Sequence, residues 1–222
     1  NGHPAYALYD APYRHYFLSR EDIAQRYGLD VAKKWIFFPE NYNWTFYTQA
    51  SIERFIEAGQ SAEDIEVMRQ FCNLSLAEVL RWCRDVAGRG NVELIIRPRP
   101  ATHLDDFKAF ADKVLDHFPP NLHLIQGESV REWILAADLV VASHSTSLIE
   151  AAVAGKHAFM LEPYPMPAVL HVDWHDLLPR IVIRDEFLDI CHRQESGNFD
   201  HRLADWARGT LMSSGDSIKN LA

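Results

Sequence analysis

The chain has 222 residues, of which 48% are hydrophobic, a composition that supports one large domain or a domain with an appendage. Its 22 basic and 31 acidic residues give a formal net charge of −9, which argues against a general binder of nucleic acid or of acidic membranes. No apolar run is long enough to predict a transmembrane segment, and no basic stretch followed by an apolar one predicts a signal peptide.

Residues 1–34 are predicted to form a linker or docking arm with one short helix. The first 19 residues are rich in Tyr, Pro and His and show no periodic pattern. Ser19 is a suitable N-cap for a helix that ends at Gly28. Residues 35–222 are predicted to form the second unit, a larger folded domain.

Strand and helix patterns alternate through this second unit. Short apolar runs predict strands at 35–39, 92–96, 122–125, 139–142, 158–161 and 180–183. Amphipathic patterns predict helices at 50–58, 62–88, 104–118, 130–137, 146–154, 185–191 and 198–212. We expect the helix at 62–88 to be broken near Asn73, because Ser75 and Glu78 match a capping box. This alternation is typical of βαβ units, so we predict an α/β fold: a Rossmann-like parallel sheet with helices on both faces.

The three cysteines, Cys72, Cys83 and Cys191, are odd in number and form no CxxC pair. They predict reduced thiols in a cytoplasmic protein. Cys72 and Cys83 are separated by about three turns of one predicted helix, so we expect both on its buried face.

The most informative segment is 138–156. A predicted strand runs into a hydroxyl-rich turn, and the helix that follows carries Glu150 in its first turn; the turn contains Ser143, Ser145, Thr146 and Ser147. Hydroxyls and free backbone amides at the start of a helix bind anions, most often phosphate. We predict that the turn binds a phosphate group and that Glu150 accepts hydrogen bonds from a ribose. The alternative for Glu150 is that it only complements the helix dipole.

Two arginines follow the predicted strand 92–96. Arg97 and Arg99 alternate with Pro98 and Pro100, which stiffen the loop. Ligands of open α/β sheets bind beyond the carboxyl ends of the strands, and guanidinium groups bind phosphate in a forked geometry. We predict that both arginines bind phosphate, the alternative being surface ion pairs.

Two further loops follow predicted strands. Gly127 and Glu128 come after strand 122–125, where a glycine lets the backbone approach a ligand, although the next residue also suffices as a helix cap. Asn41 and Asn43 come after strand 35–39 and are candidate contacts for a donor sugar. The aromatic residues of that loop, Tyr42 and Trp44, either stack on a ligand or anchor the packing.

The sequence predicts no metal site. His171, His175 and Asp176 have a spacing compatible with metal binding, but no other residues complete a ligand set. The chain has no GxGxxG, Walker lysine loop, GxSxG or HExxH motif. No catalytic residue is identified from the sequence.

The order strand–RPRP, strand–GES and DLVVASHSTSLIEAAVAGK resembles the carboxyl-terminal half of GT-B glycosyltransferases, of the bacterial surface-polysaccharide biosynthesis type. Similar patterns occur in CDP-glycerol glycerophosphotransferases and in bacterial transferases for CMP-activated sugars such as Kdo and sialic acid. The resemblance covers residues 35–165. It implies that this domain binds the donor nucleotide, with Arg99 in the place of a phosphate-binding histidine, Ser145 to Ser147 around the phosphate and Glu150 near the ribose.

The sequence departs from the family pattern in two respects, the missing histidine and the missing amino-terminal half. Arg99 cannot replace a histidine as a general acid, because a guanidinium keeps its proton near neutral pH. A GT-B enzyme has a second, amino-terminal half, which holds the acceptor and often the catalytic base, and this sequence does not contain it. We therefore expect that missing half as a partner.

The implied function is transfer of a sugar from a nucleotide-activated donor, CMP- or CDP-linked, to a glycan or lipid-linked acceptor. No cofactor or metal is expected, since the chain has no Asp-x-Asp motif. The expected location is the cytoplasm, with a peripheral position at the inner face of the membrane as one option. Two alternatives stay open: a sugar-nucleotide epimerase of the same fold, and a non-catalytic module that binds a nucleotide or a partner protein.

Overall fold

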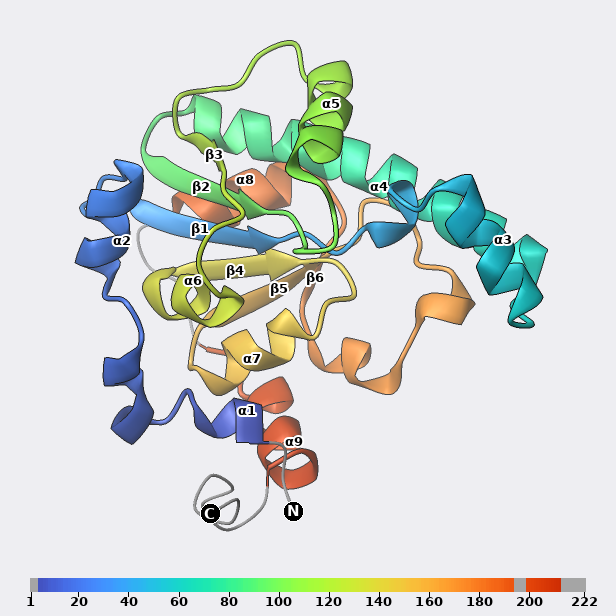
Figure 1. Cartoon of the computed structure of the whole chain (residues 1–222). Helices are drawn as coiled ribbons and strands as arrows, with labels where there is room; N and C mark the ends of the chain where they lie inside the picture. The colour runs from blue at the N-terminus through green and yellow to red at the C-terminus, as the bar shows by residue number, and fades with distance from the viewer. Residues whose placement is uncertain (1–3, 194–198, 213–222) are drawn as a thin grey trace.

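A computed structural model describes residues 4–193 and 199–212 and contains one parallel sheet (Figure 1). Its strands are β1 (Lys34–Pro39), β2 (Val92–Arg97), β3 (Leu122–Leu124), β4 (Leu139–Ala142), β5 (His157–Leu161) and β6 (Arg180–Ile181). They lie in the order β3-β2-β1-β4-β5-β6. The predicted Rossmann-like α/β fold is confirmed.

The helices fill the connections between the strands. They are α1 (Pro4–Ala7), α2 (Arg20–Tyr27), α3 (Gln49–Glu57), α4 (Ala62–Gly88), α5 (Leu104–Val114), α6 (Val130–Ala136), α7 (Ser147–Val153), α8 (Arg184–His192) and α9 (Arg202–Thr210). Short 3₁₀ helices occur at η1 (Ala11–Tyr16), η2 (Asn43–Thr45), η3 (Ala168–Leu170) and η4 (Asp173–Leu177).

Helices cover both faces of the sheet (Figure 1). Alternate side chains of β1 point to opposite faces: Ile36 and Phe38 pack with α4, α5 and α8, whereas Trp35 and Phe37 pack with α2, α6, α7 and α9. All four are fully buried. The apolar run of β1 is therefore explained by a strand that is covered on both sides.

The amino-terminal arm packs against this domain. Tyr9 and Ile23 are buried in the core that includes α6 and α7. Arg20 forms an ion pair with Asp138 at 2.9 Å, and its guanidinium lies 4.3 Å from the centre of the Trp35 ring. The arm is thus joined to the start of β4 and to β1 by packing and by charge.

The predicted boundaries of α2 are confirmed. The Ser19 hydroxyl accepts a hydrogen bond from the backbone N–H of Asp22 at 3.1 Å, and the Asp22 carboxylate accepts one from the Ser19 N–H in return. Gly28 ends the helix with φ +69°, a left-handed conformation that favours glycine.

Three predicted helix boundaries differ in the structure. The predicted break near Asn73 is wrong, because α4 is continuous and its Ser75 is fully buried inside the helix rather than at a cap. The helix predicted to reach Phe118 ends at Val114, since Leu115 is extended. The helix predicted from Asn198 begins at Arg202, and Asn198 itself lies outside the described residues.

The three cysteines are free and buried, as predicted for packing residues. Burial raises the pKa of the Cys72 thiol to about 12 and also raises the pKa of Cys83 and Cys191. Such thiols are unreactive near neutral pH.

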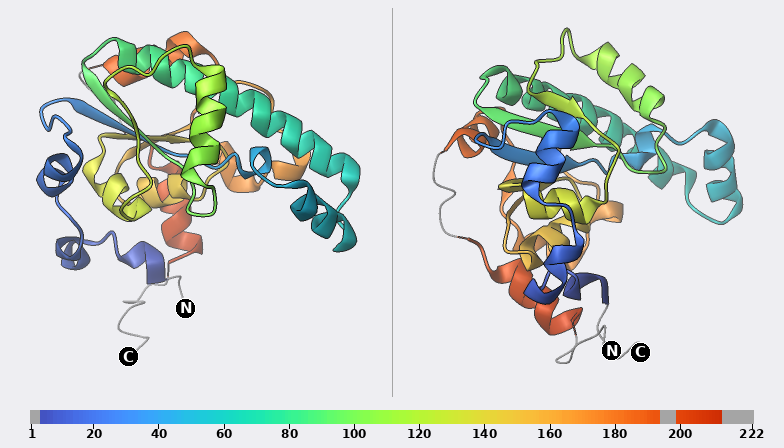
Figure 2. Two further views of the ribbon diagram at one scale, coloured as in Figure 1. Left: turned by 45° about the horizontal axis from the view of Figure 1, so that its top comes forward. Right: turned by 60° about the vertical axis from the view of Figure 1, so that its left-hand side comes forward.

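Helix α3 and the amino-terminal part of α4 extend past the sheet, on the side where the strands end (Figure 2). The Trp44 ring of η2 packs against Phe55 of α3, with ring centroids 5.3 Å apart. Among the described residues, no helix combines the length and apolar character required to cross a bilayer.

Candidate functional site

The candidate site lies at the carboxyl edge of the sheet, where β1 is flanked by β2 and β4. The chain moves outward from β1 in one direction through β2 and β3, and in the other through β4, β5 and β6. In open α/β sheets this reversal of strand order leaves a crevice in which ligands bind. Three loops meet there, those that begin at Glu40, Pro98 and Ser143.

The two arginines after β2 have different surroundings. Arg97 donates two hydrogen bonds to the carbonyl oxygen of Glu128, from Nη2 at 2.7 Å and from Nε at 3.2 Å. Arg99 is partly exposed, and its guanidinium has neither a hydrogen bond nor an ion pair within the described part of the chain. Its charge lowers the pKa of both Glu40 and His144, so it lies close to both. Arg99 is the arginine that is free to bind an anion.

Glu40 is the first residue after β1 and is 2% exposed. Its Oε1 accepts a hydrogen bond from the backbone N–H of Tyr42, whereas Oε2 is buried without a hydrogen-bond partner. Burial raises the pKa of Glu40 to about 7, although the backbone N–H groups of Tyr42 and Arg99 and the Arg99 charge act in the opposite direction. The carboxyl group therefore gains or loses its proton near neutral pH.

The hydroxyl-rich turn after β4 uses part of its polar groups internally. Ser143 is fully buried, and the Ser145 hydroxyl accepts a hydrogen bond from the backbone N–H of Ser147 at 3.3 Å. Thr146 is exposed and makes no side-chain cap, and its backbone N–H has no hydrogen bond in the described chain. The groups that remain accessible to a ligand are therefore those of Thr146 and Ser147.

His144 lies in the same turn, and the sequence analysis did not select it. Its Nδ1 is buried without a partner, and its ring packs against Tyr42 and Phe71. Burial, followed by the charges of His175 and Arg99, lowers its pKa to about 4. His144 is thus neutral at pH 7 and lies close enough to Arg99 to be affected by its charge.

The two asparagines after β1 lie apart from each other. Asn41 donates through Nδ2 to the carbonyl oxygen of His144 at 3.4 Å and so bridges the loops after β1 and β4. Asn43 donates to the hydroxyl of Tyr47 at 2.6 Å within its own loop. Asn41 therefore joins two of the loops at the carboxyl edge, whereas Asn43 is held within its own loop. A role for either in sugar binding stays a prediction.

Gly127 and Glu128 face α2. A Cβ at Gly127 would lie 2.2 Å from the Tyr27 hydroxyl, which gives a packing reason for the glycine. The Glu128 carboxylate accepts hydrogen bonds from Arg26 and, at 3.1 Å, from the Tyr27 hydroxyl. The loop is nevertheless adjacent to the crevice, because Arg97 bonds its backbone.

Glu150 in α7 is engaged by the amino-terminal arm. Its Oε2 accepts a hydrogen bond from the Tyr9 hydroxyl at 2.6 Å and lies 3.6 Å from Nε of Arg131 in the first turn of α6. These contacts fix the position of the carboxylate between α6 and α7. Its proposed ribose contact stays a prediction.

The histidines of segment 171–176 do not form a metal site. His171 Nε2 lies 3.3 Å from Asp176 Oδ1, while Nδ1 of His175 accepts a hydrogen bond from the Val172 N–H at 3.3 Å. The described residues contain no group of three or more His, Cys, Asp or Glu side chains that could hold a metal ion.

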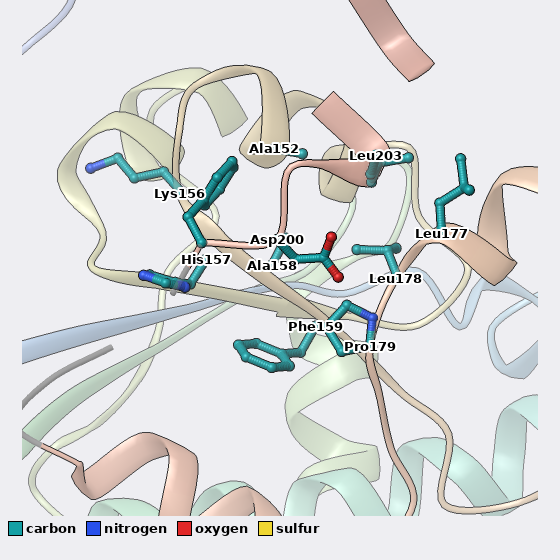
Figure 3. Close-up of a pocket in the computed structure, with 11 residues that line it drawn as sticks. Ala152, Lys156, His157, Ala158, Phe159, Leu177, Leu178, Pro179, Asp200 and Leu203 are labelled. Atoms are coloured by element: carbon teal, nitrogen blue, oxygen red, sulfur yellow. The ribbon is translucent and has the colours of Figure 1, made fainter. Parts of the chain in front are cut away.

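A separate hollow of about 240 Å³ lies at the opposite edge, where β5 and β6 begin (Figure 3). Its walls are mostly apolar, and they include Phe159 and Leu203. Asp200, the acidic residue of the wall, is paired with Arg202 at 2.7 Å. Because none of the sequence-predicted site residues lines it, the carboxyl edge remains the candidate site.

No family model and no curated protein matches this chain. A solved structure of a variant of the wall teichoic acid polymerase TagF matches with a TM-score of 0.57 and 10% sequence identity, over 99% of this chain and 48% of that one. The two share a fold. At this identity the likeness shows the fold alone, and the chain spans about half the length of the structure that it matches.

Proposed function

We propose that this chain is the donor-nucleotide-binding half of a GT-B glycosyltransferase that acts in surface-polysaccharide biosynthesis. The observation that carries the proposal is the unpaired guanidinium of Arg99 beside the Ser143 to Ser147 turn, at the reversal of strand order. The shared fold with a wall teichoic acid polymerase supports it, as do the sequence motifs.

In this proposal the domain holds the phosphate of a CMP- or CDP-linked donor. Arg99 and the backbone N–H and hydroxyl of Thr146 stabilise the negative charge that develops on the leaving phosphate. Because Arg99 keeps its proton, it supplies charge and no acid catalysis. The amino-terminal half of the enzyme supplies the acceptor site and the catalytic base, and the reaction takes place in the cytoplasm.

The test is calorimetric titration with CMP, CDP and UDP. We expect one of them to bind, and replacement of Arg99 by alanine to weaken binding by about 1.5–3 kcal/mol, the cost of losing a hydrogen bond to a charged group. Arg208→Ala is the control, because this exposed arginine lies on α9, away from the site. The Arg208→Ala variant should bind the nucleotide with the same affinity as the unchanged chain. No binding of any of the three nucleotides at millimolar concentration overturns the proposal.

Product analysis then separates the enzymatic alternatives. The chain is combined with an amino-terminal GT-B half and incubated with the donor, with and without acceptor. Transfer that depends on the acceptor supports the proposal, whereas a changed sugar released from donor alone identifies an epimerase. Binding without any turnover identifies a non-catalytic module.

A further inference from the structure

A buried carboxyl group lies beside the free guanidinium of the candidate site. Glu40 and Arg99 occupy the ends of neighbouring strands, since Pro39 pairs with Arg97 in the register of β1 and β2. Oε2 of Glu40 has no hydrogen-bond partner, although Glu40 is 2% exposed. Buried polar atoms are nearly always satisfied, so an unsatisfied carboxyl oxygen at a ligand-binding edge requires a reason.

We propose that Glu40, which lies beside Arg99, takes up one proton from solvent when the phosphate of the ligand binds to Arg99. The inference rests on the proposed anion site at Arg99. The proton moves from solvent to an oxygen of the Glu40 carboxylate, where it forms an O–H bond, and the ligand binds to the Arg99 guanidinium.

The physical reason is the electrostatics of a poorly solvated site. An ionised Glu40 is stabilised by the backbone N–H groups of Tyr42 and Arg99 and, to a smaller extent, by the charge of the Arg99 guanidinium. A phosphate on Arg99 brings negative charge close to that carboxylate, and two like charges in a desolvated site disfavour ionisation of one of them. Protonation removes the repulsion and leaves the full charge of Arg99 to the ligand.

Four titratable side chains near Glu40 and Arg99 do not change charge between pH 6 and pH 8. Burial raises the pKa of Cys72 to about 12 and raises that of Tyr42 well above its ordinary value. Burial lowers the pKa of His144 and of His175 to about 4. These four groups therefore do not account for a change in anion affinity over this range, and the comparison with Glu40→Gln assigns such a change to Glu40.

The experiment measures affinity and proton uptake by calorimetry at pH 6 and pH 8, in two buffers that differ in ionisation enthalpy. The probes are CDP-glycerol and inorganic sulfate, because neither carries a proton that titrates in this range. With the pKa of Glu40 at about 7, the binding-competent protonated fraction falls about tenfold from pH 6 to pH 8, and affinity falls with it. About one proton is taken up per ligand at pH 8.

The decisive variant is Glu40→Gln, which is neutral at every pH and similar in shape. At pH 6 the variant should bind the probe with the affinity of the unchanged chain. Its affinity should change less than twofold between pH 6 and pH 8, and it should take up no proton on binding. The matched control is Glu162→Gln, at the carboxyl end of β5, where the carboxylate is ion-paired with Arg180 at 2.8 Å. The control should keep the tenfold pH dependence.

The outcomes separate the two proposals. CDP-glycerol binding without proton uptake, or with uptake that persists in Glu40→Gln, overturns the role of Glu40 and leaves the proposed function intact. If sulfate binds with the expected proton uptake but no nucleotide binds, the role of Glu40 is supported and the proposed function is overturned. If neither probe binds, both proposals fail.

A second measurement covers the case in which Glu40→Gln does not fold. The carbon-13 signal of the Glu40 carboxyl group in the unchanged chain should titrate with a midpoint near 7 and shift to higher pH when ligand is added. A midpoint that does not move on adding saturating ligand contradicts the inference.

Discussion

Arg97 and Arg99 show how position decides the role of a residue. The two side chains are of one type and lie two residues apart, yet Arg97 is held by the carbonyl oxygen of Glu128, while the guanidinium of Arg99 has no hydrogen-bond or ion-pair partner in the described chain. Half-burial and two hydrogen bonds make Arg97 a link between the loops after β2 and β3. The free guanidinium of Arg99 is the group that an anion can recruit.

A substitution at Gly127 tests whether this glycine is required for packing against Tyr27 or for the close approach of a ligand. Gly127→Ala should lower the free energy of unfolding by about 1–3 kcal/mol, because the new Cβ would meet the Tyr27 hydroxyl at 2.2 Å. In a Tyr27→Phe background the nearest remaining atom lies at 3.4 Å, so the same change should cost much less. Urea denaturation of the four chains of this double-mutant cycle measures the coupling.

Gly88→Ala is the control for that cycle, because nothing lies within 4 Å of its added Cβ and its φ is not positive. It should leave stability unchanged or raise it slightly, as expected for alanine in a helix. Equal costs for Gly127→Ala in both backgrounds would show that the Tyr27 hydroxyl is not the reason for the glycine.

At the scale of elements, α6 and α7 begin in different ways. Ser129 and Glu132 form a complete capping box at the start of α6, in which each side chain bonds the backbone N–H of the other residue. Thr146 precedes α7 without any side-chain cap. The amino terminus of α6 is therefore capped by its own side chains, whereas that of α7 leaves the hydroxyl and backbone N–H of Thr146 available at the candidate site.

This difference predicts opposite results for two alanine variants. Ser129→Ala should lower the free energy of unfolding by about 0.5–2 kcal/mol through loss of the cap. Thr146→Ala should change stability by less than about 0.5 kcal/mol, as surface substitutions do, and should weaken nucleotide binding. Denaturation curves and calorimetry on the same two proteins provide the comparison. Weaker binding in Ser129→Ala alone would place the ligand at α6 instead of α7.

At the scale of the whole molecule, buried groups link folding to pH in opposite directions. The pKa of Glu40 is raised from 4.5 to about 7, so its contribution to stability is full below pH 4.5 and is lost as pH rises through 7. The pKa values of His144 and His175 are lowered from 6.5 to about 4, so their contribution is present above pH 6.5 and is lost as pH falls through 4. Because two histidines oppose one carboxyl group, these effects together predict that the free energy of unfolding is highest near pH 7.

The free energy of unfolding, measured by urea denaturation from pH 4 to pH 8, tests this balance. The free energy of unfolding of Glu40→Gln, relative to that of the unchanged chain, should rise by up to about 3 kcal/mol between pH 4.5 and pH 7.5, since each pKa unit corresponds to about 1.4 kcal/mol. His175→Gln should flatten the acid side of the curve and leave the alkaline side unchanged. Parallel curves for Glu40→Gln and the unchanged chain would contradict a raised pKa at Glu40.

The fold was predictable because its signals are local. Each strand is a short apolar run, and the capping patterns at Ser19 and Ser129 sit where α2 and α6 begin. The prediction failed at Asn73, where a capping pattern lies inside α4: Ser75 is fully buried there, and packing of the surrounding face overrides the local preference.

The candidate site was predictable only in part. The arginines and the hydroxyl-rich turn were found because each follows a strand. Glu40 also follows a strand directly, so its position was a usable signal, but its burial was not visible. His175 carried no such signal, because its proximity to His144 arises only in three dimensions.

The sequence by itself determined the alternation of strands and helices, the residues at the strand ends and the likeness to a known family of motifs. The tertiary structure decided which of those strand ends meet, because the order β3-β2-β1-β4-β5-β6 places β1 next to β4. That order joins Asn41 to His144 across 103 residues. It also decided that Arg97 is paired and Arg99 is not, since hydrogen-bond partners and desolvation depend on neighbours that no local pattern specifies.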